Sequence, residues 1–306
     1  TTSMSFKLIN TTHRHCVFTI DENLRPFFLK DRSLLDCLFH SVNSVVSHMF
    51  FKQNKSMNFT PGFIMVLHTF GRDLKWNPHI HCLISEGGYS DNGFWRNCTY
   101  FNYTYLRNAF RTALLNELET RLGPSFKKVK ATCYRDHKKG FYVYAKPNKC
   151  DPNVVVKYIG RYLGRPVIAT SRIDKYDGDF VTFHYNRHED DAYIEETVPV
   201  MDFIKRLIQH IPEKHYKMIR YGGIYARHRD IDKKLLRAIS RKKHHIYKSF
   251  NHWRNAILSS FGYDPLKCEC GATMLFLELY FNHKRVSLKE MYEKAMSRSR
   301  GIRSSA

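Results

Sequence analysis

Two histidines lie two residues apart in the apolar stretch "NPHIHCLISEGG", residues 77–88. In a β-strand, successive side chains alternate between the two faces of the sheet, so His79 and His81 would share one face while Ile80 and Cys82 occupy the other. Two neighbouring imidazoles repel each other when charged and leave polar nitrogens stranded when buried, and a divalent metal ion resolves both problems. The pair therefore predicts a metal site, with a pair of half-exposed surface histidines as the alternative.

A second His-x-His pair, His13 and His15 in "HRHCVFTI", is the weaker metal candidate. Its central residue is Arg14, and a cation at that position is expected to face away from a core, whereas Ile80 would anchor its strand in one. We therefore expect the metal at the pair in residues 77–88 and not at His13 and His15.

Two tyrosines four residues apart form the second candidate group. Tyr158 and Tyr162 lie in "DPNVVVKYIGRYLG", residues 151–164, which predicts a helix with both phenols on one face. Lys157, Arg161 and Arg165 share the same turns. Two phenols beside three cations are an unusual choice for a surface helix. The alternative is a pair of core aromatics surrounded by solvated cations.

The stretch "RYGGIYAR" repeats this spacing with Tyr221 and Tyr225, but Gly222 and Gly223 lie between them. A glycine pair disfavours a helix by about 2 kcal/mol relative to alanine. This segment therefore predicts a turn or strand without a functional tyrosine pair.

The net charge indicates a polyanionic partner. Of 306 residues, 50 are Lys or Arg and 28 are Asp or Glu, a formal charge of +22, and 14% are aromatic. This mixture suits single-stranded nucleic acid, whose phosphates need cations and whose unstacked bases need rings to lie on. The apolar runs are too short to cross a bilayer and no signal peptide opens the chain, so we expect a cytoplasmic protein that does not bind membranes.

The hydrophobic periodicity predicts mixed elements. We expect helices at 30–54, 104–123, 151–164 and 200–211, and strands at 16–20, 62–70, 79–85, 140–146, 166–173 and 180–186. Strands and helices without regular βαβ spacing predict an α+β fold with a largely antiparallel sheet. We expect one domain over residues 1–230 and a basic, helical C-terminal region over 231–306 with a disordered tail. Within that region Lys242, Lys243 and Lys248 are expected to contact phosphates.

Six of the eight cysteines are solitary and indicate reduced core thiols. Cys268 and Cys270 in "KCECGATM" could supply two of the four ligands of a structural Zn²⁺, although an ordinary turn is the favoured interpretation.

Taken together, a His-hydrophobic-His strand followed by a Tyr-x-x-x-Tyr helix resembles the HUH endonucleases, and most specifically the two-tyrosine rolling-circle transposases of the insertion-sequence ninety-one family, which are related to the Helitrons. The stretches "LHTFGRDLKWNPHIHCLISEGG", "YVYAKP", "VVKYIGRYLGRPVIATSRI", "FVTFHY" and "FIKRLIQHIPEKHYKMIRYGGIYAR" are similar to the family in the family's order, over roughly residues 10–230. Members usually carry a cysteine-rich zinc module before the "HCVFTI" strand. The chain lacks it and begins at Thr1, so we expect a fragment of a longer protein.

The resemblance implies an HUH-type central antiparallel sheet flanked by helices. It implies a catalytic Mg²⁺ or Mn²⁺ ion on His79 and His81, and it places His68, in "IMVLHTF", where the family has a Gln or His as third ligand.

The resemblance also implies that Tyr158 or Tyr162 attacks single-stranded DNA at element ends or target and leaves a 5′-phosphotyrosine. Lys157, Arg161 and Arg165 would hold phosphates. No P-loop or helicase segment is present, so a host helicase is an expected partner in a bacterial cytoplasm.

Two other functions stay open at this point. A rolling-circle replication initiator would use the same nicking chemistry and the same order of motifs. A catalytically decayed transposase would bind nucleic acid without cleaving it.

Overall fold

The computed structural model describes residues 8–9, 11–53, 59–90, 93–145, 167–187, 190–226, 253–274, 279–281 and 284–286. Contacts within the chain divide it into two units, Thr1–Lys248 and Ser249–Ala306. The predicted boundary between residues 230 and 231 falls outside the described residues and stays a prediction.

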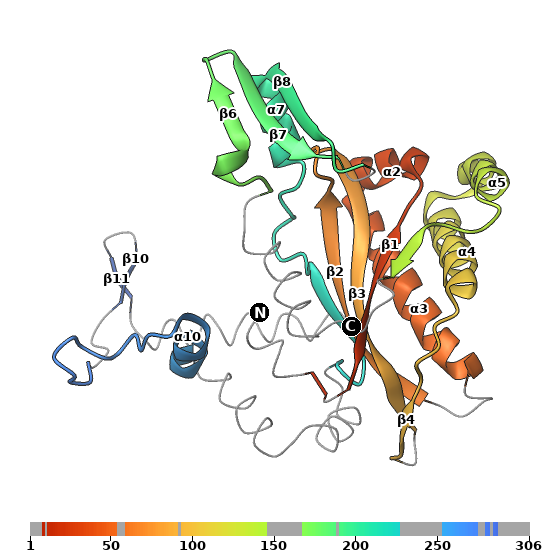
Figure 1. Ribbon diagram of the computed structural model, residues 1–306, viewed down its shortest axis with the longest axis horizontal. Helices are drawn as coiled ribbons and strands as arrows, with labels where there is room; N and C mark the ends of the chain where they lie inside the picture. The colour runs from red at the N-terminus through yellow and green to blue at the C-terminus, as the bar shows by residue number, and fades with distance from the viewer. Residues whose placement is uncertain are drawn as a thin grey trace. The chain divides into compact units, whose positions relative to one another are not determined.

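The first unit is built on a central antiparallel sheet (Figure 1). Its strands follow the order β5-β1-β3-β2-β9, and β4 adds to one end of β3. The bounds are β1 His13–Thr19, β2 Phe59–Phe70, β3 Trp76–Ser90, β4 Trp95–Asn97, β5 Val143–Ala145 and β9 Ile219–Gly223. The long hairpin of β2 and β3 forms the middle of the sheet, as expected from the two strands around the turn "GRDLKWNP".

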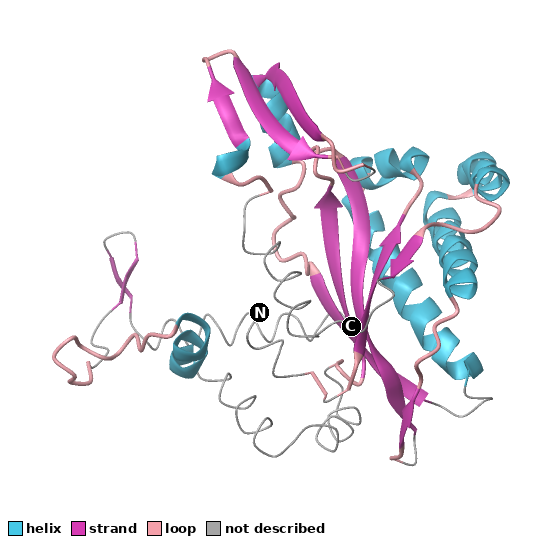
Figure 2. Cartoon of the chain, in the orientation of Figure 1, coloured by secondary structure: helices cyan, strands magenta, loops and turns pink. Residues whose placement is uncertain are grey.

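Two long helices pack against one face of this sheet, α3 (Leu35–Gln53) and α4 (Tyr103–Leu122), as Figure 2 shows. The Asn102 side chain caps α4 by accepting a hydrogen bond from the Tyr105 backbone N–H, and Gly123 ends it at a φ of 75°. The predicted helix 104–123 is confirmed, and the predicted helix 30–54 is confirmed from Leu35 onward, since Asp31 is extended and Arg32–Leu34 form a separate 3-10 turn.

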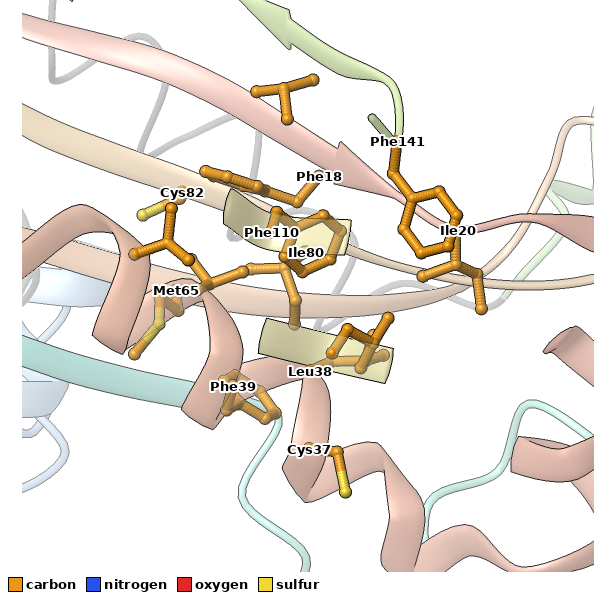
Figure 3. Close-up of a cluster of buried hydrophobic side chains, with 14 of the residues drawn as sticks. Phe18, Ile20, Cys37, Leu38, Phe39, Met65, Ile80, Cys82, Phe110 and Phe141 are labelled. Atoms are coloured by element: carbon orange, nitrogen blue, oxygen red, sulfur yellow. The ribbon is translucent and has the colours of Figure 1, made fainter. Parts of the chain in front are cut away.

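The core between sheet and helices contains side chains that alternate along the strands. Phe18, Ile80 and Cys82 point to the same face and pack with residues of α3 and α4 such as Leu38 and Phe110 (Figure 3). All five side chains are fully buried. The prediction that Ile80 and Cys82 face a core is therefore confirmed.

A second, smaller sheet lies against the tip of the β2–β3 hairpin. It consists of β6 (Ile173–Tyr176), β7 (Phe180–Asn186) and β8 (Tyr193–Pro199), and α7 (Val200–Ile208) follows it. Leu74, in the hairpin turn, is fully buried in the small core of this sheet. The Leu74 carbonyl also accepts hydrogen bonds from the side chains of Gln209 (3.2 Å) and His210 (2.9 Å). The second sheet thereby fixes the turn from which both central strands emerge.

The sequence prediction was wrong for residues 166–173. Residues 167–169 are irregular, η4 (Thr170–Arg172) is a 3-10 turn, and only Ile173 belongs to a strand. The Arg172 side chain donates hydrogen bonds to the carbonyls of His184 and Arg72, which holds this segment as a turn over the second sheet. Strand β8 and helix α5 (Lys127–Asp136) were not predicted, because their charged residues obscure the apolar periodicity.

Short elements complete the first unit: η1 Glu22–Leu24, α2 Arg25–Lys30, η2 Arg32–Leu34 and η3 Pro124–Phe126. In the second unit the structure describes α10 (Trp253–Phe261) and the hairpin of β10 (Leu279–Phe281) and β11 (Lys284–Val286). The predicted disordered tail lies outside the described residues. Among the described helices none has the length and apolar character needed to cross a membrane.

Candidate metal centre

Three histidines converge on the sheet face that α3 and α4 do not cover. His68 on β2 pairs with His79 on β3, and His81 pairs with Val66, so all three side chains share one face. One nitrogen of each lies within 4.8 Å of the other two. The shared face of His79 and His81 is therefore confirmed, and His68 joins them as expected.

The local sequence explains how His79 is aimed. The pairing of β2 with β3 shifts register between His68 and Phe70, so β3 holds an extra residue beside Pro78. Proline cannot donate to the ladder and is tolerated at such a bulge. At the bulge the Asn77 carbonyl accepts a hydrogen bond from His79 Nδ1 at 2.7 Å. His79 Nε2 is thereby left with its lone pair toward the other histidines.

A fourth histidine orients His81. His15 Nε2 lies 2.9 Å from His81 Nδ1, and the two rings stack with centroids 5.1 Å apart. This contact leaves His81 Nε2 facing His79 Nε2, 3.1 Å away. His15 was not expected at the metal site. His15 lies on β1 and pairs with Leu83 on β3, two residues from His81, and only this strand register reveals that the two rings meet.

Burial keeps the three histidines neutral. It lowers the pKa of His79 to about 4, while the hydrogen bond to Asn77 opposes the shift. It also holds the pKa of His68 and of His81 well below the usual range, and the neighbouring histidines add to this effect. Neutral imidazole is the form that binds a metal. Near neutral pH the site therefore presents three nitrogen donors without having to release protons.

The donor set fits a divalent ion. Two nitrogens that each lie about 2.1 Å from one metal are roughly 3.0–3.4 Å apart at right-angle or tetrahedral geometry. The separation of His79 Nε2 and His81 Nε2, 3.1 Å, meets this requirement. The triad could thus hold a metal ion, and imidazole donors alone do not select among Mn²⁺, Zn²⁺ and similar ions.

The other His-x-His pair has a structural role at its first member. His13 is fully buried, and its Nε2 lies 2.6 Å from the hydroxyl of Tyr225, the second tyrosine of "RYGGIYAR". The expectation for Arg14 was wrong. Its side chain lies on the helix-covered face, where it pairs with buried Glu86 at 2.6 Å and covers the Phe101 ring.

Several predicted site residues lie outside the described part of the chain. They are the two tyrosines and the cations around them, Tyr158, Tyr162, Lys157, Arg161 and Arg165, and the three lysines of the C-terminal region, Lys242, Lys243 and Lys248. Their roles stay predictions.

Cys268 and Cys270 belong to a turn. The backbone N–H of Gly271 donates to the Cys268 carbonyl at 2.9 Å, and the N–H of Cys268 donates to Ala272 at 2.9 Å. Over the described residues, only the histidine triad gathers three potential metal ligands. The turn agrees with the favoured interpretation of this motif, and the alternative of a Zn²⁺ site at these cysteines stays untested. Of the six solitary cysteines, those at 16, 37, 82 and 133 are buried as predicted, Cys98 is half-buried, and Cys150 lies outside the described residues.

Comparisons with known proteins point to DNA transposition. The model of the Y2_Tnp family, described as "Putative transposase", matches residues 62–232, more than half of the chain. The transposase for insertion sequence element IS801 of Pseudomonas savastanoi pv. phaseolicola is 32% identical over 225 residues, 70% of this chain and 54% of that protein. "Putative transposase y4qJ" of Sinorhizobium fredii is 28% identical over 244 residues, 73% of this chain and 61% of that protein. The chain thus spans between half and two thirds of the length of these relatives. No solved structure matches it.

Proposed function

The chain belongs to the Y2_Tnp family of transposases, and from this premise we propose that it nicks and rejoins single-stranded DNA by metal-dependent tyrosine transesterification. It acts at element ends in rolling-circle transposition, as an HUH-type enzyme of the insertion-sequence ninety-one family. The observation that carries the proposal is the triad of His68, His79 and His81 on one face of an antiparallel sheet. The candidate metal site and the membership of a transposase family both support a reaction that cleaves and joins DNA strands.

The histidines supply the electrophilic half of the reaction. A divalent ion, Mg²⁺ or Mn²⁺, would provide Lewis acidity toward the non-bridging oxygens of the scissile phosphate. His79 and His81, held by Asn77 and His15, keep two nitrogens directed at one point. Because these ligands are fixed before substrate arrives, little reorganisation is needed when the phosphate binds.

The tyrosines supply the nucleophile. The phenolic oxygen of Tyr158 or Tyr162 attacks phosphorus, the bond from phosphorus to the 3′ oxygen breaks, and the phenolic proton leaves while the 3′ oxygen gains one. The product is a 5′-phosphotyrosine and a free 3′-OH. One phosphodiester replaces another, so the reverse attack by a 3′-OH can join strands without ATP.

The remaining parts of the proposal concern substrate and context. Lys157, Arg161 and Arg165 hold phosphates near the tyrosines, and Lys242, Lys243 and Lys248 extend the phosphate contacts. The charge of +22 supports such a substrate. The partners are single-stranded DNA of the element ends and target, and a helicase of the bacterial host. The site of action is the cytoplasm.

The test uses the full chain, labelled single-stranded DNA from an element end, and Mn²⁺, Mg²⁺ or a chelator. We expect metal-dependent cleavage and a covalent protein–DNA adduct on a denaturing gel. His79→Ala and His81→Ala should abolish cleavage but retain most single-strand affinity, because phosphate contacts elsewhere supply it. Equal loss of cleavage and binding would assign these histidines to folding instead.

The two tyrosines are tested separately. A helix places residues four apart about 6 Å from each other along its axis, so one metal cannot align both phenols at once. Tyr158→Phe and Tyr162→Phe should each leave part of the nicking activity, and the double variant none, while either single change should impair element excision in cells. No adduct with any variant or with the parent chain would contradict the proposal.

A further inference from the structure

Two exposed tyrosines lie at β5, which is the edge strand of the central sheet among the described residues: Tyr144 is within the strand and Tyr142 directly precedes it. Tyr142 is 57% exposed and Tyr144 is 43% exposed, and they alternate with Phe141 and Val143, which are buried in the core. Their rings lie near each other, with centroids 6.4 Å apart and planes 22° from parallel. An edge strand usually carries charged or small polar side chains on its solvent side, since large apolar groups there invite aggregation. Two neighbouring exposed phenol rings at this edge therefore indicate a surface that binds another molecule.

The strand register places these tyrosines in line with the metal centre. Tyr144 pairs with Val17 on β1, and Val17 pairs with His81 on β3. The backbone carbonyl of Tyr142 accepts the N–H of Thr19, and Thr19 pairs with His79. Residues directly opposite in an antiparallel pair project to the same face. The tyrosines consequently lie on the face of the histidine triad, two strands away, or about 10 Å.

The segment that carries Tyr142 and Tyr144 is anchored to α4. Gly140, at a φ of 83°, lets the chain approach α4 so closely that an added Cβ would lie 2.3 Å from the Arg107 backbone. Phe141 then donates its N–H to the Arg107 carbonyl at 3.2 Å. The Arg107 guanidinium itself lies 5.6 Å from the centre of the Tyr142 ring. The contact with Arg107 therefore fixes both the backbone next to Tyr142 and the position of a cation beside its ring.

We propose that Tyr142 and Tyr144 form a stacking platform for the bases of single-stranded DNA beside the cleaved phosphodiester. The inference rests on the proposed function, because it takes the triad as the place of the scissile phosphate. About 10 Å corresponds to roughly three nucleotides at the ~3.4 Å spacing of stacked DNA. Base stacking on aromatic rings tolerates any sequence, and Arg107 adds a positive charge for the backbone. The platform therefore orients the strand without specifying its sequence.

The experiment measures binding without cleavage, by fluorescence anisotropy of a labelled single-stranded oligonucleotide in chelator. Tyr142→Ala and Tyr144→Ala should each weaken binding about tenfold, in the range known for loss of one base–aromatic stack. Tyr142→Phe and Tyr144→Phe should retain affinity, since stacking does not need the hydroxyl. The matched control is Tyr176→Ala on β6 of the second sheet, a tyrosine 63% exposed, which should bind as the parent chain does.

Oligonucleotides with single abasic sites identify the contact. An abasic site at the stacked position should weaken the binding of the oligonucleotide to the parent chain. With this oligonucleotide, Tyr142→Ala or Tyr144→Ala should cause no further loss of affinity. The slope of affinity against salt should stay unchanged in both variants, because no phosphate contact is removed. A loss as large in Tyr176→Ala, or additive losses at every abasic position, would overturn the inference.

The readout separates this inference from the proposed function. If the tyrosine variants lose affinity as expected and the parent chain still forms no covalent adduct with metal, base stacking on the two rings stands, whereas the nuclease proposal fails and with it the position beside a cleaved phosphodiester. If the adduct forms and the variants bind normally, the platform is wrong. Oligomerisation of the parent chain that Tyr142→Ala and Tyr144→Ala abolish, with unchanged DNA affinity, would instead assign the rings to a protein contact.

Discussion

The same strands supply the side chains of both faces of the central sheet, but the two faces have different roles. On the face covered by α3 and α4, Ile80 and Cys82 are fully buried among apolar side chains. On the other face, His79 and His81 alternate with them and meet polar partners that fix their direction. Successive side chains along a strand lie on opposite faces of the sheet. Core packing and the positioning of the histidines therefore depend on different, neighbouring residues. Substitutions on one face should therefore leave the property of the other face largely intact.

The largest expected effect comes from the core face. Ile80→Ala should lower the free energy of unfolding of the metal-free protein by about 2–5 kcal/mol through lost burial and a residual cavity. His79→Ala, one residue away, should lower it by only about 1 kcal/mol, an ordinary value for a point substitution. Urea unfolding followed by tryptophan fluorescence measures both, because Trp76 and Trp95 lie on β3 and β4 of the central sheet and the third tryptophan, Trp253, lies in the other unit. Similar losses in the two variants would mean that the histidine face is part of the core.

The next effect compares two buried histidines on the same face. His68→Ala removes one of three donors and should weaken Mn²⁺ binding by more than the ~10–100-fold that loss of an outer hydrogen bond costs. His13→Ala should leave the affinity unchanged, since its Nε2 is engaged by Tyr225 and lies outside the triad. Calorimetric titration of the metal provides the measurement. An unaltered affinity in His68→Ala would place the third ligand elsewhere.

The histidine face should also govern stability in acid. Because the pKa values of His68, His79 and His81 lie below their unfolded value near 6.5, the unfolded chain binds more protons between about pH 6.5 and about pH 4. Stability of the metal-free protein should therefore fall as pH drops through this window, by about 1.4 kcal/mol per pH unit for each histidine that stays neutral.

Urea unfolding at about pH 7 and about pH 5 tests this dependence. A triple variant with glutamine at the three positions should show a smaller loss, because it lacks the groups responsible. If parent and triple variant lose equal stability on acidification, other residues set the acid limit.

The smallest effect concerns the side chain behind the triad. His15→Ala should weaken metal binding about tenfold by releasing His81, and His15→Gln should recover part of it, since the amide oxygen can accept from Nδ1–H. Val17→Ala is the control, because Val17 pairs with His81 across the strands but offers it no hydrogen bond. The same metal titration measures all three variants. Equal weakening in Val17→Ala would reduce His15 to a packing residue.

Sequence alone predicted the features that depend on local pattern. The hairpin of β2 and β3, the helices α3 and α4, and the shared face of His79 and His81 all follow from spacing within one segment. The role of His15 depends on strand register, and the contact of His13 with Tyr225 joins positions 212 residues apart. Such pairings are decided by packing of the whole domain, which periodicity in a short window does not contain. Arg14 was misplaced for the same reason, since its partner Glu86 lies on another strand.

The bulge at Pro78 has a consequence for how this gene tolerates insertions and deletions. An extra residue on the turn side of the bulge can be absorbed there, because the ladder already contains an unpaired residue at that point. A residue inserted or deleted between His79 and His81 moves the side chains on one side of the change to the opposite face of the sheet, and one ligand moves with them. Under the proposed function, a one-residue insertion on the turn side of the bulge should therefore leave DNA cleavage intact, whereas one between His79 and His81 should abolish it.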